Sequence, residues 1–329
     1  MKRLLLPLSL LVVTLRRQFD SRYSLAGKRV LVTGGSRGLG LALARELAGR
    51  GAHLALLARN AEELETAAAE LRGRGTEVQV LVADVQEGTQ LEDALSEAVR
   101  HFGGLDVLVN VAGVIQAGPQ ANLLLEDYQE AMDVNFYAPL RAMQAARSEL
   151  RRSRGRILNV ASVGGKVGIP HLASYSASKF ALVGLGQVWR AELADEGVSV
   201  TTACPGLMQT GSARNAAIKG ERQAEYALFA TLDNLPGLSL KAAEAARRMV
   251  DALERGDAEP VIGGPARFLS LSQALAPQLT ADLMALSVRF LPGRGKDDAR
   301  QQGKELESGL TRANPVKRRS EPDLNELQS

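Results

Sequence analysis

A tyrosine and a lysine four residues apart are the clearest candidates for chemistry in this 329-residue sequence. Tyr175 and Lys179 open an alanine- and leucine-rich stretch that predicts a helix to about Glu196, and residues four apart on a helix share a face. A nearby cation stabilises phenolate, so we expect Lys179 to lower the Tyr175 pKa from about 10 toward neutrality. Ser162, at the end of an apolar run upstream, could supply a second hydroxyl to the same site.

The chain around these residues alternates short apolar strands with helices. Strands that are apolar on both faces favour a parallel sheet with helices on each side. We therefore predict an α/β fold, a single domain with a Rossmann-type, doubly wound parallel sheet and right-handed crossovers. Ligands of such sheets bind at the carboxyl ends of the strands, and the candidate residues all follow predicted strands or open helices there. The predicted strands are 29–33, 53–58, 77–83, 105–110, 156–161, 198–204 and 260–262, and the predicted helices are 39–50, 61–72, 89–102, 126–133, 138–152, 175–196 and 240–254.

A glycine-rich turn joins the first predicted strand to the first predicted helix. Glycine permits the tight turn and lets diphosphate oxygens approach backbone N–H groups at the positive end of a helix. A glycine pattern alone is a weak signal, but here a second strand–helix unit follows it. We predict a dinucleotide site, with contacts from Gly34, Ser36, Arg37, Gly38, Leu39 and Gly40.

The end of the second predicted strand indicates which dinucleotide binds. Sites for NAD commonly place an acidic residue there for the ribose hydroxyls. This strand instead ends in Ala58, Arg59 and Asn60, without a carboxylate. Arg59 and Arg37 could flank a 2′-phosphate, with charge-assisted bonds worth about 1.5–3 kcal/mol each. We therefore predict NADP(H) as the cofactor.

Taken together, these motifs resemble the short-chain dehydrogenase/reductase family, in its short, non-extended branch, over about residues 26–262. The resemblance implies a catalytic tetrad of Asn135, Ser162, Tyr175 and Lys179. It also implies cofactor contacts after later strands, made by Asp84, Val85, Asn110, Ala112, Gly113, Pro205, Gly206 and Thr210, besides Tyr175 and Lys179. Val111 departs from the usual Asn-Asn-Ala-Gly sequence after the fourth strand, which removes one structural amide.

The resemblance further implies a role for each member of the tetrad. Tyr175 exchanges a proton with the alcohol or carbonyl oxygen, and Ser162 hydrogen-bonds the same oxygen. Lys179 lowers the Tyr175 pKa and holds the nicotinamide ribose, while Asn135 orders a water that relays protons. We predict an NADP(H)-dependent oxidoreductase that interconverts a carbonyl and an alcohol. The alternatives are a catalytically silent NADP(H)-binding sensor or scaffold, and a nucleotide-sugar epimerase or dehydratase, which usually needs a larger C-terminal domain.

The two ends of the chain differ from its centre in composition. We divide it into an apolar N-terminal anchor or leader (1–24), the catalytic domain (25–265), an apolar helical segment broken at Pro277 (266–292) and a charged tail expected to be disordered (293–329). The apolar run 4–15 reaches only about 18 Å as a helix, short of the ~30 Å hydrocarbon core. A retained membrane-surface anchor, a cleaved leader and a packed extension all stay open for it.

The segment 266–292 could cover the mouth of the substrate pocket, or pack on the domain or a partner subunit. An apolar lid suits an apolar substrate, such as a steroid, a retinoid or a long-chain lipid. We therefore expect a hydrophobic small-molecule substrate and a cytoplasmic protein, with a membrane surface as a further candidate partner.

Charge and composition argue against other classes. The net charge is only +3, and the arginines are not interleaved with aromatic residues, so no nucleic-acid partner is expected. Three scattered histidines lack metal-ligand spacing, so no metal is expected. The single cysteine, Cys204, excludes an intrachain disulfide and fits a reducing compartment. Family habit suggests a homo-oligomer formed through the helices 138–152 and 175–196.

Overall fold

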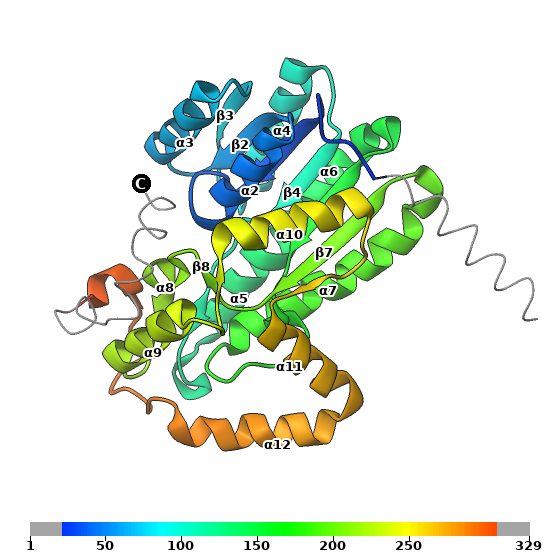
Figure 1. Ribbon diagram of the computed structural model, residues 1–329. Helices are drawn as coiled ribbons and strands as arrows, with labels where there is room; N and C mark the ends of the chain where they lie inside the picture. Colours follow the sequence, from blue (N-terminus) through cyan, green and yellow to red (C-terminus); the bar gives the residue numbers. More distant parts are fainter. Residues whose placement is uncertain (1–21, 308–329) are drawn as a thin grey trace, which may run out of the picture.

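Seven parallel strands form the central sheet of the computed structural model, which describes residues 22–307 (Figure 1). Their order across the sheet is β11-β7-β6-β4-β1-β2-β3. The predicted α/β class and parallel sheet are confirmed, and strand limits differ from the prediction by two residues at most. The strands are β1 (Arg29–Thr33), β2 (His53–Ala58), β3 (Val78–Val82), β4 (Val107–Asn110), β6 (Arg156–Val160), β7 (Ser199–Pro205) and β11 (Val261–Ile262).

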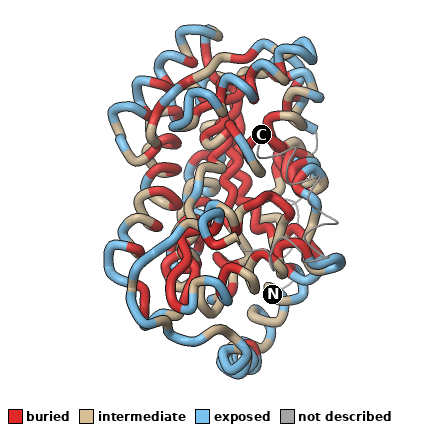
Figure 2. Tube along the Cα trace, turned by 90° about the vertical axis from the view of Figure 1, so that its left-hand side faces the viewer, coloured by how far each residue is buried: buried red, intermediate tan, exposed pale blue. Residues whose placement is uncertain are grey.

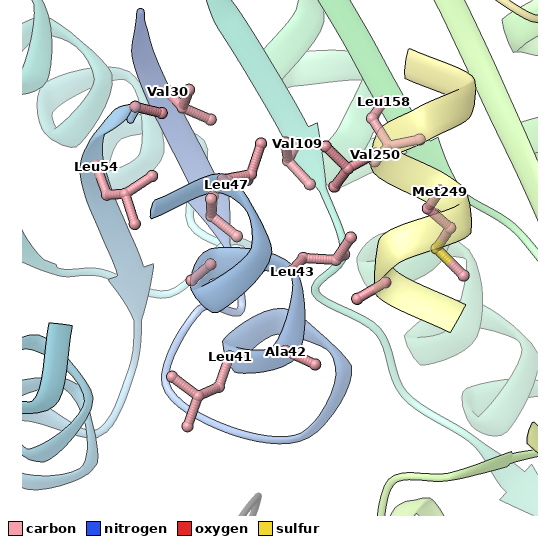
Figure 3. Close-up of a cluster of buried hydrophobic side chains, with 14 of the residues drawn as sticks. Val30, Leu41, Ala42, Leu43, Leu47, Leu54, Val109, Leu158, Met249 and Val250 are labelled. Carbon is pink, nitrogen blue, oxygen red and sulfur yellow. The ribbon is translucent and has the colours of Figure 1, made fainter. Parts of the chain in front are cut away.

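Helices cover both faces of this sheet, because the strands are apolar on both sides. One face packs against α2 (Gly38–Gly49), α3 (Ala61–Gly73) and α10 (Ala242–Arg255). Figure 3 shows Leu43 and Leu47 of α2 directed toward Val250 of α10 and Val109 of β4. Each fully buried leucine of this kind stabilises the fold by about 1.5–3 kcal/mol.

The opposite face packs against α4 (Gly88–Phe102), α6 (Ala138–Ser153) and α7 (Ala173–Glu192). In Figure 2 the buried residues run through the middle of the molecule, between the two helical layers. Phe180 and Val188 are exposed on α7. The predicted homo-oligomer through these helices stays a prediction.

The strand order reverses direction between β1 and β4, which lie side by side. After β1 the chain builds β2 and β3 on one side of β1, and it then returns to build β4 on the other side. The connections that follow β1 and β4 therefore run in opposite directions, and a crevice opens between the carboxyl ends of these two strands. The glycine turn begins directly after β1, and Asn110 ends β4. The fold therefore places the predicted dinucleotide site at the switch point of the sheet.

The two helices predicted over 126–133 and 138–152 form one continuous run. A π-helical turn, Asp133–Tyr137, joins α5 (Leu125–Met132) to α6. Single π-helical turns often occur at functional sites, because the extra residue changes the direction of a side chain. Asn135 lies at the centre of this turn.

The region between β7 and α10, for which the sequence predicts no element, is largely structured. It holds β8 (Met208–Gln209), α8 (Ser212–Asn215), β9 (Ala217–Ile218) and α9 (Arg222–Asn234). The remaining short strands are β5 (Gln116–Ala117), β10 (Leu240–Lys241) and β12 (Gln301–Gln302), of which β10 pairs with β8.

Disorder from residue 293 onward was predicted, and this is wrong for residues 293–307. Strand β12 pairs antiparallel with β9, which also pairs with β5. Leu306 is buried against Tyr226 and Ile218, and Tyr226 donates a 3.0 Å hydrogen bond to Glu307. A few apolar contacts and one strand pairing thus order a segment of polar composition. Residues 308–329 lie outside the described part of the chain.

The apolar segment 266–292 forms two helices beyond the carboxyl edge of the sheet, α11 (Gly264–Leu275) and α12 (Pro277–Ser287). Pro277 is the first residue of α12, where its missing N–H costs nothing. Within residues 22–307, no helix is both long enough and apolar enough to cross a membrane. The predicted N-terminal anchor or leader lies almost wholly outside these residues, so it stays a prediction.

Candidate functional site

The structure brings the four predicted catalytic residues together at the carboxyl edge of the sheet. Tyr175 and Lys179 lie on the first turns of α7, and the Lys179 Nζ is 5.7 Å from the centre of the Tyr175 ring. Ser162 follows β6 and caps a short helical turn, with its Oγ accepting a 3.0 Å hydrogen bond from the Gly164 N–H. Asn135 comes from the π-helical turn and contacts the loop after β4.

The prediction that the Tyr175 pKa is lowered is wrong for the protein chain. Burial raises the Tyr175 pKa to about 12, although a hydrogen bond with Ser162 opposes this rise. Desolvation penalises the charged phenolate more than its neighbours stabilise it. Tyr175 is therefore a neutral phenol near neutral pH.

Lys179 is buried close to this phenol. Burial lowers the Lys179 pKa to about 8, and its Nζ donates a 2.9 Å hydrogen bond to the Val160 carbonyl at the end of β6. A Cβ at Gly113 would lie 3.7 Å from this Nζ and 3.0 Å from the Asn135 Oδ1. Glycine at position 113 thus leaves open the space between the lysine and the asparagine.

The Asn135 side chain uses its amide within the protein. Its Oδ1 accepts a 3.0 Å hydrogen bond from the Val114 N–H, and its Nδ2 donates to the Val114 carbonyl and the Ser178 hydroxyl, each at 3.0 Å. Asn135 therefore fixes the loop after β4 against α7. Its predicted ordering of a water stays a prediction.

The glycine turn between β1 and α2 leaves room for a diphosphate. Gly34 has a positive φ of 72°, and a Cβ there would lie 2.8 Å from the Ala112 Cα. A Cβ at Gly40 would lie 1.9 Å from the Gly34 carbonyl oxygen. Among residues 22–307, no side chain caps the first turn of α2, so none of them competes there for its N–H groups. These features fit the diphosphate of the predicted dinucleotide.

Hydroxyl and amide groups join the two strands at the switch point. Thr33 Oγ1 accepts hydrogen bonds from the N–H groups of Val111 and Ala112, at 3.2 and 3.4 Å. These bonds hold the strands together at the position where Val111 replaces the expected amide. Asn110 donates a 2.9 Å hydrogen bond to Asn159, so its buried side chain joins β4 to β6 rather than facing the crevice.

Both arginines predicted to flank a 2′-phosphate lie beside carboxylates. Arg37 forms a 3.0 Å ion pair with Glu63 on α3, and the same carboxylate accepts a 3.2 Å hydrogen bond from Ser36. Arg59 lies 3.6 Å from Asp84, the predicted adenine contact. The second strand–helix unit therefore does carry a carboxylate at this edge, which the sequence reading overlooked. Exposed pairs of this kind are worth only about 0–1 kcal/mol, so a phosphate can compete for both arginines.

The last predicted cofactor segment also reaches the glycine turn. A Cβ at Gly38 would lie 3.4 Å from the Thr210 carbonyl oxygen, so the segment after β7 lies against the start of α2. The Gly206 N–H donates a 2.9 Å hydrogen bond to the Ile262 carbonyl. A Cβ at Gly206 would lie only 2.9 Å from the Ala266 Cβ, so position 206 has no room for a side chain. Val85 is buried behind Asp84, in the core on the α4 side of the sheet.

A pocket of about 400 Å³ opens beside Ser162 and Tyr175. Its walls are mostly apolar and come from α9, α11, α12 and the loops at the carboxyl edge, with Ile169, Leu207, Phe229, Leu269, Met284 and Leu291 among them. Besides Tyr175, three ionisable side chains line it, His171, Glu225 and Asp233. Burial raises the Asp233 pKa to about 7, although Asp233 accepts a 2.6 Å hydrogen bond from Ser212.

The sequence matches the model of one protein family, described as short chain dehydrogenase, over residues 28–220. The chain belongs to the short-chain dehydrogenase family of oxidoreductases. Among curated relatives, the 11-beta-hydroxysteroid dehydrogenase-like 4A protein of Arabidopsis thaliana is 35% identical over 260 residues, which cover 77% of this chain and 82% of that protein. The granaticin polyketide synthase putative ketoacyl reductase 1 of Streptomyces violaceoruber is 40% identical over 183 residues, 55% of this chain and 67% of that protein.

Solved structures of similar proteins hold the predicted cofactor. A short-chain dehydrogenase from Burkholderia cenocepacia J2315, solved in complex with NADP, superposes with a TM-score of 0.66 at 31% sequence identity. The superposition covers 74% of this chain and 100% of that protein's chain. A blue fluorescent protein from a metagenomic library, in complex with NADPH, gives a TM-score of 0.63 at 31% identity over 74% and 98% of the two chains. The predicted cofactor, NADP(H), agrees with these two complexes.

Most of the predicted site residues therefore converge, Asn110 and Val85 excepted, but the sequence prediction missed four side chains near them. Glu63 could have been found as a carboxylate in the first turn of the helix after Arg59. His171 lies four residues before Tyr175, a spacing that places it near the same edge. Glu225 and Asp233 carry no comparable signal, since the helix that brings them to the pocket was not predicted.

We expect Asp233 to make stability depend on pH. The folded state keeps the Asp233 proton up to about pH 7, whereas the unfolded chain loses it near the ordinary pKa of 3.8. This carboxyl therefore lowers stability as pH rises through that window, by about 1.4 kcal/mol per pH unit at most. In Asp233→Asn, the melting temperature should fall less between about pH 4 and pH 7 than in the wild type. Asp282→Asn, at an exposed carboxylate on α12, is the control, and equal profiles for wild type and Asp233→Asn would contradict the assignment.

Proposed function

We propose that this protein is an NADP(H)-dependent oxidoreductase that interconverts a hydrophobic carbonyl compound and its alcohol. One observation carries the proposal: Tyr175 and Ser162 both line a largely apolar pocket. A carbonyl oxygen between these two hydroxyls would lie inside an apolar cavity, next to the crevice that suits a dinucleotide. The chemistry of the pocket thus agrees with the family.

The side chains divide the work of the reaction. Bound in the crevice at the switch point, NADP(H) supplies or accepts the hydride. Tyr175 donates its proton to the carbonyl oxygen in the reducing direction, and Ser162 stabilises the charge on that oxygen. Lys179, held by the Val160 carbonyl, stabilises the phenolate that Tyr175 becomes. Its lowered pKa of about 8 lets it pass a proton on near neutral pH.

The preference for NADP(H) rests on Arg37 and Arg59. Both are partly exposed at the carboxyl edge, beside the end of β2. Their present partners, Glu63 and Asp84, are partly exposed as well, so exchanging a carboxylate for a phosphate costs little desolvation. Glu63 nevertheless lies close enough to Arg37 to oppose a second negative charge. The two arginines and Glu63 therefore set the preference jointly.

We also propose that the enzyme works at a lipid surface. A row of large apolar side chains on α11, α12 and the turn after them is open to solvent, including Phe268, Leu275, Leu279, Leu283 and Phe290, of which Leu275 and Phe290 are 76% and 81% exposed. Figure 2 shows the exposed helix at the bottom of the molecule. Exposed Arg267, Arg289 and Arg294 flank the row and suit an anionic headgroup layer. The same two helices line the pocket, so the row would bring its mouth to the lipid.

Replacing Tyr175 by Phe should abolish turnover while leaving NADPH binding nearly intact, because only the exchangeable proton is lost. General acid catalysis contributes roughly 10²–10⁴-fold, so we expect kcat to fall by that factor. The measurements are NADPH oxidation over ketones and aldehydes of graded chain length, and NADPH binding by fluorescence.

Tyr137→Phe, an exposed tyrosine at the start of α6, is the matched control and should keep full activity. A Tyr175→Phe variant that retains most of the wild-type rate would refute the mechanism. If the wild type binds NADPH but reduces no carbonyl compound and oxidises no alcohol, the silent sensor becomes the better description.

Two substitutions should move cofactor preference in opposite directions. Arg59→Asp removes one charged contact to the 2′-phosphate and should lower the NADPH over NADH ratio of kcat/KM roughly ten- to a hundredfold. Glu63→Gln removes the carboxylate beside Arg37 and should raise the same ratio. Glu62→Gln, which changes the neighbouring carboxylate, is the control. Equal use of both cofactors by the wild type would show that the assignment is wrong.

Membrane association should depend on the apolar row of α11 and α12. A variant with Phe268, Leu275 and Phe290 all changed to Ser should float less with anionic vesicles than the wild type. Each Å² of apolar surface removed from the row lowers the free energy gained by burial in the membrane by about 25 cal/mol. A chain that begins at Leu25 separates this contribution from that of the N-terminal apolar run. If the wild type, the triple variant and the shortened chain all stay with the soluble fraction, the lipid-surface proposal fails.

A further inference from the structure

A buried histidine and glutamate face each other in the wall of the substrate pocket. The His171 Nδ1 lies 2.5 Å from the Glu225 Oε1, and the two side chains are only 12% and 4% exposed. His171 belongs to the loop that leads into α7, and Glu225 to the first half of α9. The pair therefore joins the element that carries Tyr175 to the helix that forms the opposite wall.

The backbone holds His171 in an unusual conformation. Its φ is +63°, in the left-handed region that residues other than glycine rarely adopt. Its carbonyl accepts a 2.8 Å hydrogen bond from the Gly118 N–H, which fixes the loop. Strained conformations of this kind persist where the surrounding structure requires a particular side-chain direction. Here the direction is toward the pocket and Glu225.

The contact between His171 and Glu225 uses one polar atom of each side chain and leaves the other polar atom available for a hydrogen bond. Within residues 22–307, the His171 Nε2 and the Glu225 Oε2 have no hydrogen-bond partner. Both residues line the pocket, whose other walls are mainly apolar. A carboxylate oxygen accepts a hydrogen bond, and an imidazole nitrogen donates or accepts according to its protonation. A ligand group that hydrogen-bonds these atoms gains specificity, because an analogue that lacks the group leaves them unpaired once it fills the pocket.

We propose that His171 and Glu225 form a polar subsite that binds a hydroxyl group of the substrate, away from the reacting carbon. A hydroxyl both donates and accepts a hydrogen bond, so one group can satisfy the imidazole and the carboxylate together. The substrate class is then a hydrophobic ketone or alcohol that bears a second, remote hydroxyl. This inference rests on the proposed carbonyl–alcohol activity and names the feature of the substrate that the pocket selects.

The test compares matched ketones in matched variants. Aliphatic ketones of graded chain length are assayed with NADPH, each with and without a terminal hydroxyl. The variants are His171→Asn, because asparagine tolerates a positive φ, and Glu225→Gln, which keeps the shape of the side chain. Leu228→Met, on the same helix and in the same pocket, is the control for altered packing.

The wild type should prefer the hydroxylated ketone of one chain length, through a lower KM. Both subsite variants should lower kcat/KM for that ketone about tenfold or more, while kcat/KM for the plain ketone stays within about twofold. An equal loss on both ketones, with a lower melting temperature, would show that the pair only ties α9 to the loop. A wild type that prefers the plain ketone at every length would also overturn the subsite. If the wild type reduces neither series, the proposed function itself fails.

Discussion

The close approach of β1 and β4 is the constraint on which the site depends. Gly34 lies so near Ala112 that a Cβ there would come within 2.8 Å of the neighbouring backbone. Thr33 then bonds the first residues after β4, and Asn135 bonds the next turn of the same loop. Since Asn135 also contacts Ser178 on α7, the position of the catalytic helix is linked to the glycine turn through a short chain of hydrogen bonds.

Burial determines the electrostatics of this arrangement. Lys179 and Tyr175 lie where charge is poorly solvated, so the pKa of the phenol rises and that of the ammonium falls. Both shifts favour the neutral forms, so an ammonium at Lys179 is a stronger acid than the Tyr175 phenol and can return a proton to a phenolate formed there. Tyr175 is thus a neutral phenol rather than an activated phenolate.

The pocket is assembled from segments that are distant in the sequence. Helix α9 and the ordered part of the C-terminal tail pack on each other through Tyr226 and Leu306, while α11 and α12 cover the other side. None of these elements belongs to the central sheet. The carboxyl edge of the sheet therefore holds the crevice and the predicted catalytic residues, and the later segments supply most of the pocket walls and their polar residues.

The sequence by itself determined the sheet and its covering helices, and it predicted the residues that meet at the carboxyl edge of the sheet. Those features have local signals: runs apolar on both faces, glycines at a strand–helix turn, and Tyr175 and Lys179 one helical turn apart. Helix α9 and the fold of residues 293–307 lacked such signals, since each is stabilised by contacts with residues far away in the chain.

The tertiary structure alone decided the electrostatic environment of the site. The sequence placed a cation near Tyr175 and so predicted a lowered pKa, but it could not show that burial raises the Tyr175 pKa instead. Likewise, the sequence could not show that Glu63 lies beside Arg37, or that Glu225 lies beside His171, 54 residues away in the chain. Residue types and spacing predict which groups are available, but solvation and through-space distance, which set their charges and partners, exist only once the chain has folded.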